Sequence, residues 1–232
     1  MTRLRAVVTD IEGTITSIAF VKDVLFPYAR ERLPGFVRRH AARADVAALL
    51  DDTRALAGEP DLDTEATVAR LLTWIDADRK ATPLKTLQGM VWAEGYSAGH
   101  FVGHVYPDAA AALRRWHAAG IALYAYSSGS VEAQRLLLGH SEAGDLASIF
   151  SGHFDTRTGA KTDDASYRAI AATLALDPSA IVFLSDAVSE LEAASAAGMR
   201  AAQACRDGQA PDGRYPAFTS LDTLALEPFA RS

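Results

Sequence analysis

The stretch LRAVVTDIEGT, residues 4–14, decides the fold class. Its first part is a short apolar run rich in β-branched residues, which ends in the carboxylate of Asp10 and reaches Gly13 three residues later. This order is typical of a buried parallel strand that runs into a loop. We therefore expect Asp10 to lie at the carboxyl end of the first strand of a parallel sheet.

Beyond Tyr106, helical and extended patterns alternate along the chain. PDAAAALRRWHAAG (107–120) has proline at a helix start and glycine at its end, and the strand-like run IALYAYS (121–127) follows. The alternation continues through SVEAQRLLLG, IFSGHF, DDASYRAIAATLAL, AIVFLSD, SELEAASAAG and MRAAQA (130–204). Such a rhythm predicts an α/β fold, a doubly wound, Rossmann-like parallel sheet with helices on both faces.

Between the first strand and this alternation lies a stretch of different character. From about Pro27 to His104 the chain consists of helix-forming segments such as ARADVAALLDDTRALAG (42–58), with no strand-like run between them. We expect a core of residues 1–20 and 105–232 that is interrupted by an all-helical domain of residues 21–104.

One segment of the expected insertion, GYSAGHFVGH (95–104), leaves alternatives open. On a helix, its glycines at four-residue intervals would share a face, which either allows tight helix packing or borders a substrate together with Tyr96. His100 and His104 have an i, i+4 spacing that a metal could use, but no third ligand is evident.

The composition excludes several classes of function. The formal charge of -6 and the pI of about 5.5 give no general attraction to nucleic acid. No window approaches the roughly 18 apolar residues of a membrane span, and the first residues do not resemble a signal peptide. The single cysteine, Cys205, excludes an internal disulfide and fits a reducing compartment. We expect a cytoplasmic monomer without nucleic acid or membrane partners.

Polar side chains gather where the predicted core strands end. They are Asp10 with Glu12, Ser127 with Ser128, Asp186 with Glu190, and Lys161 in a loop before a helix. Ligands of open α/β sheets bind at the carboxyl ends of the strands, so one pocket can collect all of them. Carboxylates that hold a hard divalent cation, with an ammonium and hydroxyls for an anion, predict phosphoryl transfer. Taken singly, each is as well explained by a cap, a turn or a solvated surface residue.

The ordered set resembles the haloacid dehalogenase superfamily, whose phosphatases have DxDGT on the first strand, a Ser or Thr ending the second, a distant Lys and a later acidic pair. Here the motifs are DIEGT (10–14), YSSGS (126–130), Lys161 and SDAVSE (185–190). The resemblance implies a haloacid dehalogenase core with an inserted helical cap domain that selects the substrate. Glu12 departs from the pattern, which has Asp at this position.

This departure points to a subgroup. Together with FVKDVLFPYAR (20–30), YPDAAAAL (106–113) and GHFDTRTGAK (152–161), the chain resembles the bifunctional enolase-phosphatases, or acireductone synthases, of methionine salvage. That family uses magnesium to enolise 2,3-diketo-5-methylthiopentyl-1-phosphate and then to dephosphorylate it to the acireductone 1,2-dihydroxy-3-keto-5-methylthiopentene. The resemblance implies this small phosphorylated metabolite as substrate and one Mg²⁺ per active site.

The resemblance also implies roles for individual residues. Asp10 would be the nucleophile and a metal ligand, Glu12 the acid/base residue or a contributor at the metal, and Asp186 a further metal ligand. Ser127, Ser128 and Lys161 would hold the phosphoryl group, and Glu190 would orient Lys161 or a water on the metal.

Three other readings follow from the same residues. A phosphatase for another small metabolite keeps the chemistry and changes only the substrate. A non-enzymatic binding module requires a damaged catalytic position, and none is damaged. A dehalogenase needs no magnesium and lacks the acidic pair found in SDAVSE.

Overall fold

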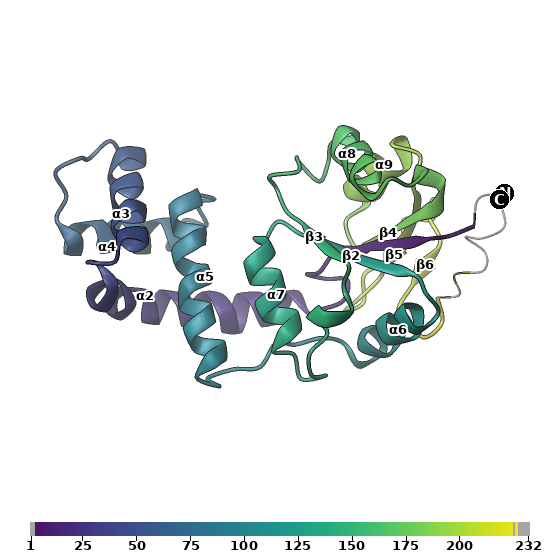
Figure 1. Cartoon of the computed structure of the whole chain (residues 1–232), viewed down its shortest axis with the longest axis horizontal. Coiled ribbons are helices and arrows are strands. Elements are labelled where there is room, and N and C mark those ends of the chain that lie inside the picture. The colour runs from purple at the N-terminus through teal and green to yellow at the C-terminus, as the bar shows by residue number, and fades with distance from the viewer. Residues whose placement is uncertain (1–2, 225, 227–232) are drawn as a thin grey trace. The chain divides into compact units, whose positions relative to one another are not determined.

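The computed structural model describes residues 3–224 and 226, and these form two compact units (Figure 1). The first unit comprises Met1–Ile18 and Val102–Ser232, and the second comprises Ala19–Phe101. The boundaries at residues 18 and 101 fall shortly before the expected ones at 20 and 104. The role of the second unit as a cap stays a prediction.

In the described part of the chain, six parallel strands form one sheet in the order β3-β2-β1-β4-β5-β6. From β1 the chain builds the sheet outward in one direction through β2 and β3, and then in the other direction through β4, β5 and β6. This reversal at β1 is the pattern of a doubly wound sheet. The predicted parallel core is therefore confirmed. The strands are β1 (Ala6–Thr9), β2 (Ala122–Tyr126), β3 (Gly152–Phe154), β4 (Ile181–Ser185), β5 (Arg200–Ala204) and β6 (Ala217–Phe218).

The central strand β1 determines where the site forms. It pairs with β2 on one side and with β4 on the other, and all four of its residues are buried. Ligands of doubly wound sheets bind at the carboxyl ends of the strands where the order reverses. Asp10 follows β1 directly and Asp186 follows β4 directly, so both lie at this position.

Helices cover both faces of the sheet, with α8 and α9 on one face and α6 on the other (Figure 1). Helices α8 and α9 pack onto Val8 and Phe183 through Tyr167, Ile170 and Leu191 in one buried apolar cluster. The helices of this unit, with two short 3-10 segments, are α6 (Pro107–Ala118), α7 (Val131–Gly139), η2 (Ala147–Ile149), α8 (Asp164–Leu174), η3 (Pro178–Ala180) and α9 (Val188–Ala196).

Local sequence signals account for where these helices begin and end. The side chain of Ser130 accepts a hydrogen bond from the amide of Ala133 at the start of α7, and Asp163 does the same for Ala165 at the start of α8. Pro107 begins α6, and Gly120, with φ of 79°, follows its last turn. These caps place the preceding loops, which carry Ser127 and Lys161.

The second unit is a helical bundle with its own core. Its buried side chains include Leu33 and Phe36 from one helix and Leu71 and Trp74 from another, all in one apolar cluster. The elements are α1 (Ile18–Phe20, which begins at the unit boundary), a π-helical turn η1 (Val21–Leu25), α2 (Phe26–His40), α3 (Ala44–Ala57), α4 (Thr64–Asp76) and α5 (Thr82–Ser97).

The structure corrects the sequence analysis at both ends of this helical segment. Helix formation begins at Ile18 rather than near Pro27, because the π-helical turn continues the helical backbone into α2. At the other end, α5 stops at Ser97, and Gly99 has a φ of 68° that ends the helix. The expected common helical face of Gly95, Gly99 and Gly103 was therefore wrong.

None of the helices in the described part of the chain has the length and apolar composition to cross a membrane.

Candidate active site

A buried lysine joins two carboxylates at the end of the sheet. The ammonium of Lys161 forms an ion pair with Oδ1 of Asp10, and its distance to Oε2 of Glu190 is 2.7 Å. Only 10% of the Lys161 side chain and 6% of the Asp10 side chain are exposed. Burial lowers the pKa of Lys161, but the charges of Asp10 and Glu190 outweigh this and raise it above its usual value. The lysine is therefore fully charged at neutral pH.

Glu190 is held from its other side by Ser185. The hydroxyl of Ser185 donates to Oε2 of Glu190 over 2.8 Å and accepts from the amide of Ala187. Burial and the charge of Asp10 raise the pKa of Glu190, while Lys161 and Ser185 lower it. A chain of contacts thus runs from the end of β4 through Glu190 and Lys161 to Asp10.

Glu12 and Ser127 form a second contact in the same region. The hydroxyl of Ser127 donates to Oε2 of Glu12 over 2.8 Å and accepts from the amide of Gly129 over 3.0 Å. Burial and the charge of Asp10 raise the pKa of Glu12, and the hydrogen bond from Ser127 lowers it. The loops after β1 and β2 are joined by this contact.

Asp186 lies against the loop that follows β1. Its amide donates to the hydroxyl of Thr14 over 3.1 Å, and a Cβ built on Gly13 would lie only 2.6 Å from its Oδ2. Gly13 has a φ of 80°, a conformation that other residues adopt at a cost. The close approach of Asp186 to the loop therefore depends on glycine at this position. Burial and the charge of Asp10 raise the pKa of Asp186 to about 6.

These charges fit a divalent cation. Among the described residues, the negative charge of Asp10 raises the pKa values of three other carboxyls, those of Glu12, Asp186 and Glu190. The ammonium of Lys161 offsets part of this effect at each of them. Carboxylate oxygens are the donors that Mg²⁺ prefers. No group of three or more His, Cys, Asp or Glu side chains in the described ranges is arranged to hold a metal by itself. A cation held by these carboxylates would therefore need further ligands from outside this group.

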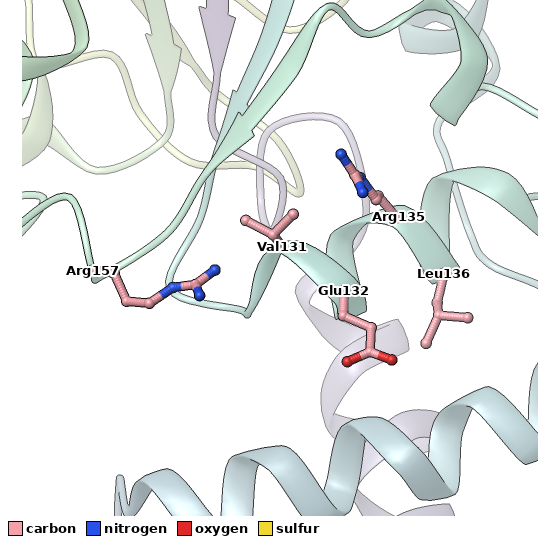
Figure 2. Close-up of a pocket in the computed structure, with 5 residues that line it drawn as sticks. All are labelled: Val131, Glu132, Arg135, Leu136 and Arg157. Atoms are coloured by element: carbon pink, nitrogen blue, oxygen red, sulfur yellow. The ribbon is translucent and has the colours of Figure 1, made fainter. Parts of the chain in front are cut away.

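A cavity of about 490 Å³ lies between the start of α7 and the loop that follows β3 (Figure 2). Buried Asp155 joins its two sides, because it accepts hydrogen bonds from the amide of Val131 and from the guanidinium of Arg157. Asp155 therefore holds the start of α7 near the Lys161 loop. The cavity is lined by Val131, Glu132, Arg135, Leu136 and Arg157.

Comparison with known proteins identifies the family. Residues 4–198 match the model of the haloacid dehalogenase-like hydrolases. An enolase-phosphatase E1 of Methylococcus capsulatus is 54% identical, with 97% of this chain and 99% of the relative covered. The chain belongs to the enolase-phosphatases. An enolase-phosphatase E1 of Azotobacter vinelandii is 56% identical over 98% of this chain and 99% of its own.

Solved structures share the fold of this chain. The UTR4 protein (Unknown transcript 4 protein) of Saccharomyces cerevisiae has a TM-score of 0.83 and 35% identity, with 96% of this chain and 100% of that chain covered. A dehalogenase with a TM-score of 0.59 and 19% identity, covering 100% of both chains, shares the fold alone. The expected resemblance to the enolase-phosphatases, the fold and the enzyme class are confirmed.

The structure of this enolase-phosphatase brings most of the expected site residues together. Asp10, Lys161 and Glu190 form one connected group, and Glu12 with Ser127 forms a second. Asp186 interacts with Asp10 through its charge. Ser128 differs from its neighbour, because Ser127 is fully buried and Ser128 is exposed.

The two histidines with i, i+4 spacing do not share a helix. His100 lies beyond the end of α5, where its Nδ1 is 2.8 Å from the hydroxyl of Tyr28. His104 belongs to the other unit, and its Nδ1 accepts from the amide of Ser17 over 3.1 Å. The metal site that their spacing allowed therefore has no support in the structure.

Sequence reasoning assigned no separate role to Thr14 or Ser185, although both lie within the quoted motifs. The hydroxyl of Thr14 fixes the amide of Asp186, and that of Ser185 fixes Glu190. In the sequence, only their positions indicated a role: Thr14 lies four residues after Asp10, and Ser185 lies next to Asp186. Asp155, in DTRTGAK, had a weaker signal as a lone acidic residue before a loop.

Proposed function

We propose that this enolase-phosphatase converts 2,3-diketo-5-methylthiopentyl-1-phosphate to the acireductone 1,2-dihydroxy-3-keto-5-methylthiopentene and phosphate, with one Mg²⁺ per active site. The family assignment supports this substrate. The buried ion pair of Asp10 with Lys161, at the carboxyl end of the central strand, is the observation that carries the proposal.

Phosphate transfer would begin with Asp10. Its carboxylate attacks phosphorus, the bond from phosphorus to the substrate oxygen breaks, and an aspartyl phosphate forms. The leaving oxygen takes a proton from Glu12, whose raised pKa favours a protonated carboxyl. Glu12 then takes a proton from the water that hydrolyses the aspartyl phosphate, which restores both residues.

The phosphoryl group would be held by Lys161, Ser127 and Ser128. Lys161 is charged and supplies a positive group beside the nucleophile, which offsets repulsion between Asp10 and a phosphate dianion. Glu190 positions this ammonium through its ion pair. Since Ser127 also donates to Glu12, substrate binding would compete for its hydroxyl.

Asp10 and Asp186 would hold the magnesium ion, and Glu12 would remain the acid/base residue. When bound, the cation would offset the carboxylate charge and would supply Lewis-acid polarisation to the phosphoryl and carbonyl oxygens of the substrate. This chain's own contribution is the close arrangement of these carboxylates after β1 and β4.

A comparison of substrates tests the proposal. The wild-type enzyme is assayed with the diketo phosphate and with a panel of sugar phosphates, each with magnesium and with chelator, and the values of kcat/KM are compared. We expect the diketo phosphate to be preferred and chelator to abolish phosphate release. Preference for a sugar phosphate would support the alternative that the chain is a phosphatase for another small metabolite.

We also propose a cytoplasmic location and a monomeric state for the enzyme. The single cysteine, Cys205, is buried and unpaired by any disulfide, which fits a reducing compartment. Size-exclusion chromatography with light scattering tests the monomer, and a dimer mass would contradict it.

A further inference from the structure

A tight turn after β5 reaches both loops that carry the expected metal ligands. Its residues are Arg206, Asp207, Gly208 and Gln209, and the amide of Gln209 donates to the carbonyl of Arg206 over 3.0 Å. The φ values of Asp207 and Gly208 are 53° and 82°. Two positive φ values at an Asp-Gly pair are typical of a rigid type I′ turn. The turn thus presents the side chains at its two ends in a fixed arrangement.

Arg206 is buried, although it carries a full charge. Its Nη1 is 2.9 Å from Oδ2 of Asp108 and donates to the carbonyl of Thr219 over 2.8 Å. The guanidinium lies over the ring of Tyr106 at 4.4 Å from the ring centre. These contacts offset part of the cost of burying the charge and fix the plane of the guanidinium, although its Nη2 is buried without a hydrogen-bond partner among the described residues.

A further contact of this guanidinium reaches the loop after β1. Nε of Arg206 donates to the carbonyl of Thr14 over 3.1 Å. Thr14 is fully buried, and its hydroxyl accepts from the amide of Asp186. Thr14 therefore connects the turn, the loop after β1 and the loop after β4.

Gln209 makes the corresponding contact on the β4 side. Its side-chain amide donates to the carbonyl of Asp186 over 2.9 Å. The peptide of Thr14 and the peptide of Asp186 are thus each bound by one end of the same turn. Residues 206–209 lie outside the four superfamily motifs quoted from the sequence.

We infer that this turn sets the separation of Asp10 and Asp186, and that Arg206 and Gln209 are positioning residues for the magnesium site. The inference rests on the proposed magnesium-dependent function. Neither side chain is a ligand; each holds the backbone of a loop that carries one. Residues that orient metal ligands in this way typically change metal affinity by about 10–100-fold when they are replaced.

Calorimetric titration of the substrate-free protein with Mg²⁺ tests the inference. We expect the affinity of Arg206→Met for Mg²⁺ to fall by about tenfold or more. Gln209→Leu should bind Mg²⁺ more weakly than wild type by a smaller factor. Gln209 is exposed, so this variant should fold even if Arg206→Met does not.

Arg115→Met is the matched control. Arg115 donates to the carbonyl of Leu221, in the C-terminal segment that follows the turn, and among the described residues its contacts are with Leu221 and Asp222 rather than with Thr14 or Asp186. Its Mg²⁺ affinity should equal that of wild type. An equal loss of affinity in Arg115→Met and Gln209→Leu would show a general effect of the C-terminal segment and would overturn the inference.

Rescue by guanidinium provides a second measurement. Arg206→Ala removes the side chain, and millimolar guanidinium chloride should restore Mg²⁺ binding while the same concentration of potassium chloride should not. Unchanged Mg²⁺ affinity in Arg206→Met and Gln209→Leu would overturn the positioning role. Absence of Mg²⁺ binding by wild type would instead overturn the proposed function, so the two failures are distinct.

Discussion

The hydroxyl of Ser127 donates a hydrogen bond to Oε2 of Glu12 over 2.8 Å. Glu12 stands where the superfamily pattern has Asp, and its extra methylene lets the carboxylate reach the loop after β2. This hydrogen bond links Glu12, the proposed acid/base residue, to Ser127, a proposed phosphate-binding residue.

Shortening Glu12 should separate it from Ser127. We expect Glu12→Asp to keep its fold and to lose about 100-fold in kcat on the diketo phosphate, because a misplaced acid/base group forfeits its catalytic contribution. Steady-state kinetics measure this. Glu192→Asp is the same change at an exposed position, where the glutamate pairs with Arg214, and should leave kcat unchanged. Equal kcat in Glu12→Asp and wild type would exclude a positional requirement for Glu12.

Removing the ammonium of Lys161 should destabilise the metal-free protein as well as inactivate it. Lys161→Met leaves Asp10 and Glu190 buried without their cation, which costs about 3–5 kcal/mol in the free energy of unfolding. The loss should be larger at pH 8 than at pH 5, since burial and the charge of Asp10 raise the pKa of Glu190, and its protonation at the lower pH removes one of the two unpaired charges. Chemical denaturation at both pH values measures it.

The control for this variant is Lys80→Met, which removes an exposed lysine paired with Asp78. Its cost should stay below about 1 kcal/mol. A loss in Lys161→Met as small as that of the control would mean that the buried ion pair has little influence on stability.

Gly13→Ala should weaken magnesium binding. The new methyl group would overlap Oδ2 of Asp186, and the φ of 80° adds strain of about 1–2 kcal/mol. Displacement of this carboxylate should lower Mg²⁺ affinity by at least about tenfold. Gly58→Ala imposes the same kind of strain at a φ of 71° with open space around it. If calorimetry finds equal Mg²⁺ affinities in the two variants, the proximity of Gly13 to Asp186 has no role in binding.

The raised pKa of Asp186 predicts how the stability of the metal-free protein varies with pH. Its pKa in the fold is about 6, above the usual 3.8, because burial and Asp10 disfavour its charge. The protonated carboxyl thus favours the folded state at low pH, and this contribution is lost as the pH rises through about 6. The melting temperature without metal should fall from pH 5 to pH 7.5, and less steeply in Asp186→Asn. A slope that is the same in both proteins would contradict the assignment.

The sequence predicted the parts of the fold that depend on local patterns. Strand β1 has three apolar residues followed by Thr9 and is buried on both faces, and α7 begins directly after the capping residue Ser130. The motif order also located Asp10 and Asp186 at neighbouring strand ends. Each of these features depends on residues that are close together in the sequence, so a short segment is enough to predict it.

Other features depend on contacts between distant segments. Strand β6 has two residues, one of them exposed, so Ala217 and Phe218 have no pattern of their own and are ordered by β5. The π-helical turn before α2 likewise has no distinct signal in its sequence. Arg206 could not be recognised as a residue near the site, because its contact with Thr14 joins residues 192 positions apart.

The claim that Asp10 is the nucleophile has a direct test. Wild-type enzyme is mixed with the diketo phosphate and magnesium, quenched in acid within one turnover, digested and examined by mass spectrometry. We predict a phosphorylated peptide with the modification on Asp10, absent from Asp10→Asn, whose kcat should fall by at least about 10³-fold. Normal phosphate release by Asp10→Asn, or a phosphorylated residue other than Asp10, would show that Asp10 is not the nucleophile.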